Sequence, residues 1–262
     1  MHRQLLHLYG PLAINSFGLF IVIGLIVFSA LFLSDPKRPK LISLDTYFNG
    51  LSLAILAGLI GGRLLFVITH WSMIENWGNI FAFWLGGFSL LGGIIALLLV
   101  IPLYLRMNDV TIIPLLDLAA TYAPLLQSIS RLGCFFAGCC FGIPTTLPFG
   151  IINTECGILG MNNKFLHPTQ LYSAFSLLGI FLLLYFILQY YFQKPGQLFF
   201  AYLFLMSLER FTVDFWRADR EYLSITALQL FSIPQWVALC IALSSAIAFG
   251  IITIGKHKRI HT

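Results

Sequence analysis

Charged residues are scarce in this sequence. Asp, Glu, Lys and Arg together make up only 10% of its 262 residues, whereas hydrophobic residues make up 59%. Soluble domains contain about a quarter charged residues, so the composition excludes an ordinary water-soluble domain and indicates a chain that lies in lipid. The net charge is +5, but the basic residues form no long polar face, which argues against a nucleic-acid partner.

The sequence also lacks a long polar region, an internal repeat and a low-complexity tract. Instead, apolar runs follow one another, each near the 20 or so residues that a helix needs to cross the hydrocarbon core. We therefore expect an all-α, polytopic membrane protein with about seven transmembrane helices, forming a single domain over residues 1–262. The first run ends without the small-residue pattern of a signal-peptide cleavage site. The expected spans are residues 13–33, 48–70, 81–105, 112–130, 170–192, 197–215 and 233–254.

The lysines and arginines between these runs predict an orientation, because cytoplasmic loops of membrane proteins are enriched in them. With seven spans, eight of the 15 basic residues fall on one side, so the N-terminus is expected outside and the C-terminus in the cytoplasm. Residues 141–168 then form an outer loop, and their Gly, Pro, Asn and Thr content predicts an irregular, partly re-entrant segment or lid. The eight residues are Lys37, Arg38, Lys40, Arg106, Lys194, Lys256, Lys258 and Arg259.

Three arginines, Arg63, Arg131 and Arg210, lie in or beside the predicted spans. A charge near the bilayer centre costs at least about 2.5–3.5 kcal/mol, so each arginine needs a partner. One interpretation is internal ion pairs, such as Arg210 with Asp214. The other is a pocket for an anion, because guanidinium groups bind phosphate well. Three- and four-residue spacing predicts one helical face for Glu209, Arg210, Asp214 and Arg217.

Two further patterns each allow two interpretations. The diglycines Gly86-Gly87 and Gly92-Gly93 predict either closely packed helices or a broken helix whose amides meet an anionic head group. The motif His-Pro-Thr-Gln-Leu-Tyr at residues 167–172 is either a helix start with an interfacial tyrosine or part of a substrate site.

The cysteines are few and unevenly placed. Cys240 lies in an apolar run and is interpreted as a small core residue. The other four lie between residues 134 and 156, and three of them closely follow Arg131, which would lower a thiol pKa. They allow a covalent nucleophile, a structural or redox disulfide, a soft-metal site with Cys156 or His167, or plain packing. Because the spacing Cys-x4-Cys-Cys matches no established zinc or iron–sulfur pattern, we predict no metal.

Five motifs in order resemble the bacterial prolipoprotein diacylglyceryl transferases. The resemblance runs from about residue 17 to residue 234, nearly the whole chain. Each motif alone is weak evidence, but the order and spacing of all five are specific. The motifs are Gly-Gly-Arg at 61–63, Trp-x-Gly-Gly-x-Ser-x-x-Gly-Gly at 84–93, Arg-Leu-Gly at 131–133, His-Pro-Thr-Gln-Leu-Tyr at 167–172 and Glu-Arg-Phe-x-x-x-Phe-x-Arg at 209–217.

The resemblance implies transfer of a diacylglyceryl group from phosphatidylglycerol to a prolipoprotein cysteine thiol, with glycerol phosphate as the leaving group. It implies a multi-pass protein of the bacterial cytoplasmic (inner) membrane whose site faces the outer leaflet. The expected partners are phosphatidylglycerol and prolipoprotein signal peptides, and no cofactor is expected. Two alternatives are a paralogue with a different acceptor and a non-catalytic lipid-binding or thiol-redox membrane protein.

Motif positions also imply roles for residues. Arg131 matches the arginine that holds the phospholipid head group, and Arg210 matches a second essential arginine. Cys134 and Cys139 stand where the family has Asn and Glu, Leu91 where it has His, and Asp214 where it has Glu. The predicted catalytic residues are Cys134, Cys139, Cys140, Arg210 and Asp214. The predicted substrate-binding residues are Arg131, Arg63, Arg217, Gly92, Gly93, His167, Gln170 and Tyr172.

Overall fold

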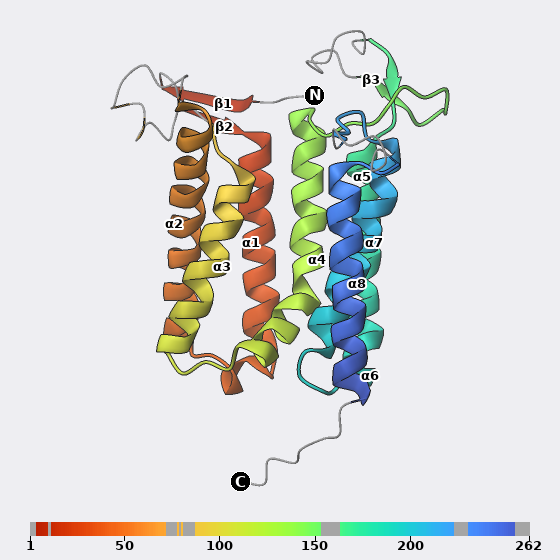
Figure 1. Ribbon diagram of the computed structural model, residues 1–262. Coiled ribbons are helices and arrows are strands. Elements are labelled where there is room, and N and C mark those ends of the chain that lie inside the picture. The colour runs from red at the N-terminus through yellow and green to blue at the C-terminus, as the bar shows by residue number, and fades with distance from the viewer. Residues whose placement is uncertain are drawn as a thin grey trace, which may run out of the picture. The chain divides into compact units, whose positions relative to one another are not determined.

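Helices dominate the structure, a computed structural model that describes residues 4–9, 12–71, 78, 80, 87–152, 163–222 and 230–254 (Figure 1). Among these residues, six helices are long and apolar enough to cross a membrane. The predicted all-α, multi-pass membrane fold is therefore confirmed. The remaining expected span corresponds to α7 (Gln197–Val213), which has 17 residues. A total of seven spans and their orientation stay predictions.

The larger of two compact units comprises residues 1–7, 13–34 and 116–262. Within it, α7 packs against both α5 and α8 (Figure 1). Helix α1 packs on α4, where Phe20 and Phe136 stack with ring centroids 5.1 Å apart. The helices of this unit are α1 (Ser16–Ser34), α4 (Ile112–Ala137), α5 (Thr169–Leu183), a π-helical turn (Leu184–Leu188), α6 (Gln189–Tyr191), α7 and α8 (Ile233–Ile254).

The smaller unit comprises residues 8–12 and 35–115 and is built on α2 (Leu44–Thr69) and α3 (Leu90–Met107). The two helices meet at glycines, since a Cβ added to Gly92 would lie 2.3 Å from the carbonyl oxygen of Gly61. This contact confirms the close-packing interpretation of the second diglycine. Helix α3 begins later than the expected 81–105 span, with Ser89 as its N-cap, and residues 81–86 lie outside the described residues.

Short strands and turns complete the described chain. The first two strands, β1 (Gln4–Tyr9) and β2 (Leu12–Asn15), pair with each other, and a 3-10 turn covers Arg38–Lys40. That one membrane domain covers residues 1–262 stays a prediction.

The expected loop at 141–168 contains an antiparallel strand pair, β3 (Ile151–Ile152) and β4 (Phe165–Leu166). The part of this loop that the structure describes contains no helix, as predicted, and Cys156 lies outside that part. Main-chain hydrogen bonds fix its beginning between two other segments. The N–H of Gly142 donates to the carbonyl of His167 at 2.9 Å, and that of Ile143 donates to the carbonyl of Trp216 at 2.9 Å.

Helix α7 ends earlier than the sequence suggested. It stops at Val213, and a 3-10 turn over Asp214–Trp216 follows it. Arg217 then adopts an extended conformation with ψ 144°. The prediction that Arg217 shares a helical face with Glu209 and Arg210 was therefore wrong, because the chain has left the helix before it reaches Arg217.

Candidate functional site

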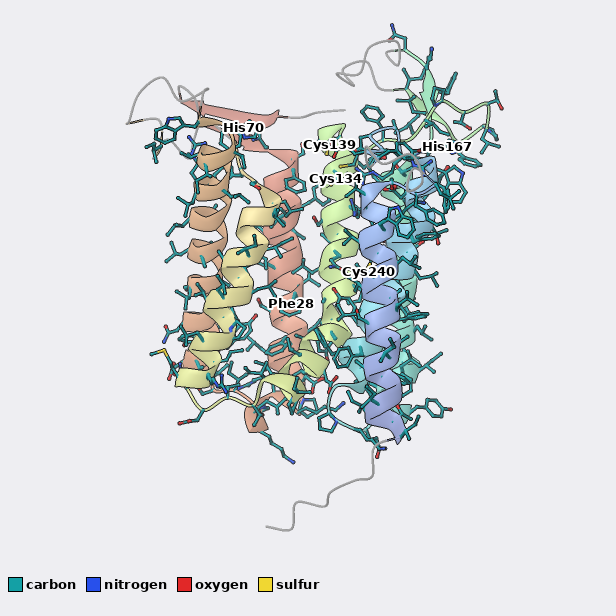
Figure 2. All side chains as sticks on the ribbon, viewed as in Figure 1. Phe28, His70, Cys134, Cys139, His167 and Cys240 are labelled. Atoms are coloured by element: carbon teal, nitrogen blue, oxygen red, sulfur yellow. The ribbon has the colours of Figure 1, made fainter. Side chains whose placement is uncertain are left out.

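Three cysteines, Cys134, Cys139 and Cys140, meet where α4 ends. Figure 2 labels two of them, Cys134 and Cys139. The main-chain N–H of Gly138 donates to the carbonyl of Phe135, and that of Cys139 donates to the carbonyl of Cys134, both at 3.2 Å. These two bonds, with Gly138 in the left-handed region at φ 71°, form a Schellman motif. The motif folds Cys139 back over Cys134. Cys140, at φ 61°, then turns the chain again.

The outcome is a compact triangle of thiols. The sulfur atoms of Cys134, Cys139 and Cys140 all lie within 4.8 Å of one another, and all three cysteines are free. Helix α5 holds the turn in place from outside. Gln170 Nε2 donates to the carbonyl of Cys139 at 2.6 Å, and Thr169 Oγ1 donates to the carbonyl of Cys140 at 2.7 Å. The sequence prediction that these cysteines form one cluster is supported.

Two arginines, Arg131 and Arg217, lie within electrostatic range of this triangle, and a third, Arg210, lies near both of them. Arg131 lies one helical turn before Cys134 on α4 and acts on both Cys134 and Cys140. Arg210 on α7 is close enough to Arg131 and Arg217 to be repelled by the charges of both. Among the residues that the structure describes, the Arg131 side chain makes no hydrogen bond and no ion pair. A half-buried, unpaired guanidinium beside two like charges favours an anionic ligand.

A buried carboxylate balances one side of this arginine cluster. Asp214, 1% exposed, accepts a contact from Arg210 at 3.3 Å and one from Arg220 at 3.7 Å. Ser232 donates a hydrogen bond to the same carboxylate, and Arg220 Nη2 also donates to Gln235 at 2.9 Å. The predicted ion pair of Arg210 with Asp214 is confirmed. Since this pair involves one Arg210 nitrogen, other guanidinium N–H groups remain for a second acceptor.

Arg217, the third member of the arginine cluster, lies beside Cys140. Asp219 accepts two hydrogen bonds from Arg217, at 2.7 and 2.5 Å, and this interaction raises the pKa of Arg217 even though burial opposes its charge. Hydrogen bonds from Cys134 and Cys139, together with the nearby charges of Arg217 and Arg131, hold the pKa of the Cys140 thiol well below its ordinary value. The pKa of Cys139 is raised, because its proton is held in hydrogen bonds to its two neighbours. This environment favours the thiolate form of Cys140.

A groove of about 540 Å³ lies next to the cluster, between α5 and α7. One end is polar: His167 Nδ1 and the Tyr172 hydroxyl are 2.9 Å apart, and Glu209 accepts a hydrogen bond from Ser173 at 2.5 Å. Glu209 also interacts electrostatically with Arg131, Arg210 and Arg217. Because Glu209 lines the groove, the arginines lie close to it. The remaining wall is mostly apolar and includes Leu147, Phe149, Ile180, Leu205, Leu208, Val213 and Trp216.

The structure leaves part of the predicted site untested. Arg63 belongs to the smaller unit, where it is 5% exposed and donates to the carbonyls of Ile80 at 3.1 Å and Gly87 at 3.0 Å. A role of Arg63, Gly92 or Gly93 in binding substrate stays a prediction. Asp117 on α4 accepts main-chain hydrogen bonds from Gly196 and Phe199 at the start of α7.

Comparison with known proteins decides the family. The model of a family described as prolipoprotein diacylglyceryl transferase matches residues 3–251. The chain belongs to the prolipoprotein diacylglyceryl transferase family. It is 32% identical over 254 residues to the phosphatidylglycerol–prolipoprotein diacylglyceryl transferase of Clostridium tetani, covering 96% of this chain and 98% of that protein.

A second relative shows similar coverage. The chain is 31% identical to phosphatidylglycerol–prolipoprotein diacylglyceryl transferase 2 of Clostridium perfringens, over 92% of this chain and 91% of that protein. The resemblance inferred from five motifs is therefore confirmed for nearly the full length of the chain.

Sequence reasoning missed three contributors to this transferase-family site. Glu209 was placed on a helical face with Arg210 but was not predicted as a site residue, yet it lines the groove. Ser173 and Asp219 were not considered, although they bind Glu209 and Arg217. A signal for Ser173 was available, because it lies three residues after Gln170 and therefore close to the same face of α5.

Proposed function

We propose that this protein transfers a diacylglyceryl group from phosphatidylglycerol to the cysteine thiol of a prolipoprotein. The names of its relatives identify the two substrates. The observation that carries the proposal is Arg131, which is half-buried and has no protein partner among the described residues, beside Arg210 and Arg217. Guanidinium groups match the geometry of phosphate oxygens, and a buried unpaired cation is costly in a membrane.

The arginines would act on the leaving group. The acceptor sulfur attacks the glycerol carbon that bears the phosphate, a carbon–sulfur bond forms, and the carbon–oxygen bond breaks. Glycerol phosphate leaves with the electron pair of that bond. Arg131 and Arg210 stabilise the additional negative charge that develops on the phosphate oxygen, as preorganised donors do in other transfer reactions.

The acceptor thiol must lose its proton, because the thiolate is the nucleophile. Hydrogen bonds from Cys134 and Cys139, with the charges of Arg217 and Arg131, lower the pKa of Cys140 and favour its thiolate form. A phosphate anion bound by the same arginines raises the pKa of Cys140, since like charges disfavour ionisation. The Cys140 thiolate then accepts the acceptor's proton. A covalent relay through Cys140 is disfavoured, because its second step would have to break the carbon–sulfur bond of an unactivated thioether and expel the Cys140 thiolate.

The groove between α5 and α7 would take an acyl chain of the phospholipid. Its volume lies within the range of small-molecule sites, and its apolar wall continues along both helices from the polar end at Glu209. Each methylene moved from water to such a wall contributes about 0.8 kcal/mol, although for a lipid the reference is the bilayer and the gain is smaller. The groove therefore contributes mainly orientation.

The proposal places the protein in the bacterial cytoplasmic (inner) membrane with this site toward the outer leaflet. The basic residues of the sequence support that orientation, because they gather on one side if seven helices span. Prolipoprotein signal peptides would then meet the site after crossing the membrane.

Purified protein in nanodiscs with acyl-labelled phosphatidylglycerol and a lipobox peptide tests the proposal. We expect the peptide to become lipidated, and the rate to fall by about 100-fold or more in Arg131→Ala and Arg210→Ala. Arg106→Ala is the matched control, because Arg106 is exposed at the end of α3 in the smaller unit. Wild-type protein that binds the lipid yet leaves the peptide unmodified would contradict the proposal.

A further inference from the structure

The thiol triangle has a geometry that lipid transfer alone does not require. A proton acceptor needs one thiol, whereas the structure brings together three, from the last turn of α4 (Cys134) and from the two residues after Gly138 (Cys139 and Cys140). Cysteine spacing in the sequence predicted no metal, whereas the structure brings the three sulfur atoms together. We propose that Cys134, Cys139 and Cys140 form a three-coordinate binding site for a soft, monovalent metal ion of the copper(I) type. This inference does not rest on the proposed transferase activity, because it uses only the positions of the sulfur atoms and the charges around them.

The distances fit a trigonal thiolate site. A metal–sulfur bond of about 2.3 Å places three sulfur atoms roughly 4 Å apart when the ion lies in their plane. The three sulfur atoms here already lie within 4.8 Å of one another, so small rotamer changes close the site. A disulfide needs a sulfur–sulfur distance near 2.05 Å, and the three cysteines are free.

The donor set selects the kind of ion. Thiolate ligands favour soft ions such as copper(I), whereas structural zinc almost always takes four protein ligands. The group that the structure brings together contains three ligand residues, with no fourth His, Cys, Asp or Glu among the described residues. A site of three sulfurs is therefore better suited to copper(I) than to zinc.

The surrounding charges favour the thiolate form of the ligands. Arg131 and Arg217 lie within electrostatic range of Cys140, and Asp219, which pairs with Arg217, offsets part of their charge. Arg217 is also within hydrogen-bonding reach of the Cys140 sulfur. Hydrogen-bond donors next to a metal–thiolate centre orient its ligands and increase its metal affinity.

The cluster is accessible from one side and rigid on the other. Cys139 is exposed, while Cys134 is 7% exposed, so an ion can enter past Cys139 and reach the buried sulfur. The Schellman motif and the hydrogen bonds from Thr169 and Gln170 fix the main chain that carries the ligands. Ligands held before the ion arrives lose less conformational freedom on binding.

Anaerobic titration of the reduced, full-length protein with copper(I), buffered by a chromogenic chelator, tests the site. We expect one copper ion per chain, and an affinity about tenfold or more lower in Cys139→Ser. Cys139→Ser is chosen because the side chain is exposed and the change is small. Cys240→Ser, midway along α8, is the matched control and should bind copper as the wild type does.

X-ray absorption of the copper-loaded protein supplies a second readout that needs no variant. Three sulfur neighbours at about 2.3 Å are expected. Two sulfur neighbours, equal binding by Cys139→Ser, or tighter binding of zinc(II) than of copper(I) would each overturn the proposal. Because none of these measurements depends on lipid transfer, an inactive transferase would leave the metal assignment intact, and the converse also holds.

Discussion

Gln170 on α5 donates a hydrogen bond from Nε2 to the carbonyl oxygen of Cys139 at 2.6 Å. This bond joins the His-Pro-Thr-Gln-Leu-Tyr motif to the cysteine turn 31 residues earlier in the chain. Gln170 is 1% exposed, so the contact is inside the protein. Two motifs that appear separate in the sequence are therefore one structural unit.

Gly138→Ala should disturb the cysteine turn. Gly138 has φ 71°, a conformation that costs an L-residue about 1 kcal/mol or more. We expect a lower unfolding temperature in detergent and weaker copper binding. Gly179→Ala is the matched control, because a Cβ there would meet nothing within 4 Å. Equal stability of Gly138→Ala and the wild type would show that the Schellman turn does not fix this cluster.

Asp214→Asn should destabilise the larger unit. The carboxylate is the shared partner of Arg210 and Arg220, and its removal leaves two partly buried cations without their counterion. Arg210 is 30% exposed on its side chain, so we expect a loss of about 2–3 kcal/mol rather than the larger cost of a fully buried pair. Denaturant unfolding monitored by circular dichroism measures it.

The control for that change is Asp109→Asn. Asp109 is exposed and has φ 53°, a conformation that Asn tolerates well. It should unfold like the wild type. If both variants lost the same free energy of unfolding, the loss would not be specific to the arginine cluster, and the prediction would be wrong.

Alkylation of Cys140 should depend weakly on pH. Its pKa is lowered by hydrogen bonds from Cys134 and Cys139 and by Arg217, so the reactive thiolate is present above that lowered pKa and is lost only when the pH falls through it. Peptide mass spectrometry after brief iodoacetamide treatment between pH 5 and pH 9, where ordinary thiols titrate near 8.5, measures the profile.

Arg217→Gln is the informative variant for that profile. Removal of one stabilising charge should move the inflection of Cys140 alkylation to higher pH, while Arg106→Gln should leave it unchanged. A wild-type rate that increases about tenfold per pH unit between pH 7 and 8 would mean that Cys140 behaves as an ordinary thiol.

Ser176→Phe should impair lipid binding without loss of stability. Ser176 is exposed and lines the groove between α5 and α7, so a phenyl ring there fills space that an acyl chain would use. We expect a higher KM for phosphatidylglycerol, by about tenfold, with little change in unfolding temperature. Ser244→Phe, exposed on α8, is the control. An unchanged KM in Ser176→Phe would place the acyl chain elsewhere.

Much of the fold was predictable because length and apolarity alone specify a membrane helix. The ion pair of Arg210 with Asp214 was predictable for a similar reason, since four-residue spacing is a local property. The position of Arg217 was not, because the change from α-helix to a 3-10 turn at Asp214 depends on tertiary contacts such as the hydrogen bond from Ser232.

The thiol triangle shows where sequence reasoning reached its limit. The cluster was predicted, but its geometry depends on Gly138 and on the unusual backbone of Cys140. Gly138 follows α4 and is a recognisable helix-ending signal, so the meeting of Cys134 with Cys139 could have been inferred. The left-handed conformation of Cys140 could not, because that conformation is rare for a cysteine.

The central claim is that an acceptor thiol displaces glycerol phosphate from phosphatidylglycerol at the arginine cluster. A single-turnover reaction with phosphatidylglycerol labelled in both the acyl chain and the head-group glycerol tests it most directly. We predict that each lipidated peptide is accompanied by one released glycerol phosphate, and that a peptide with Ser in place of the acceptor Cys releases none. Release of glycerol phosphate at the same rate with the Ser peptide would contradict the account, because the lipid would then be cleaved without a thiol acceptor.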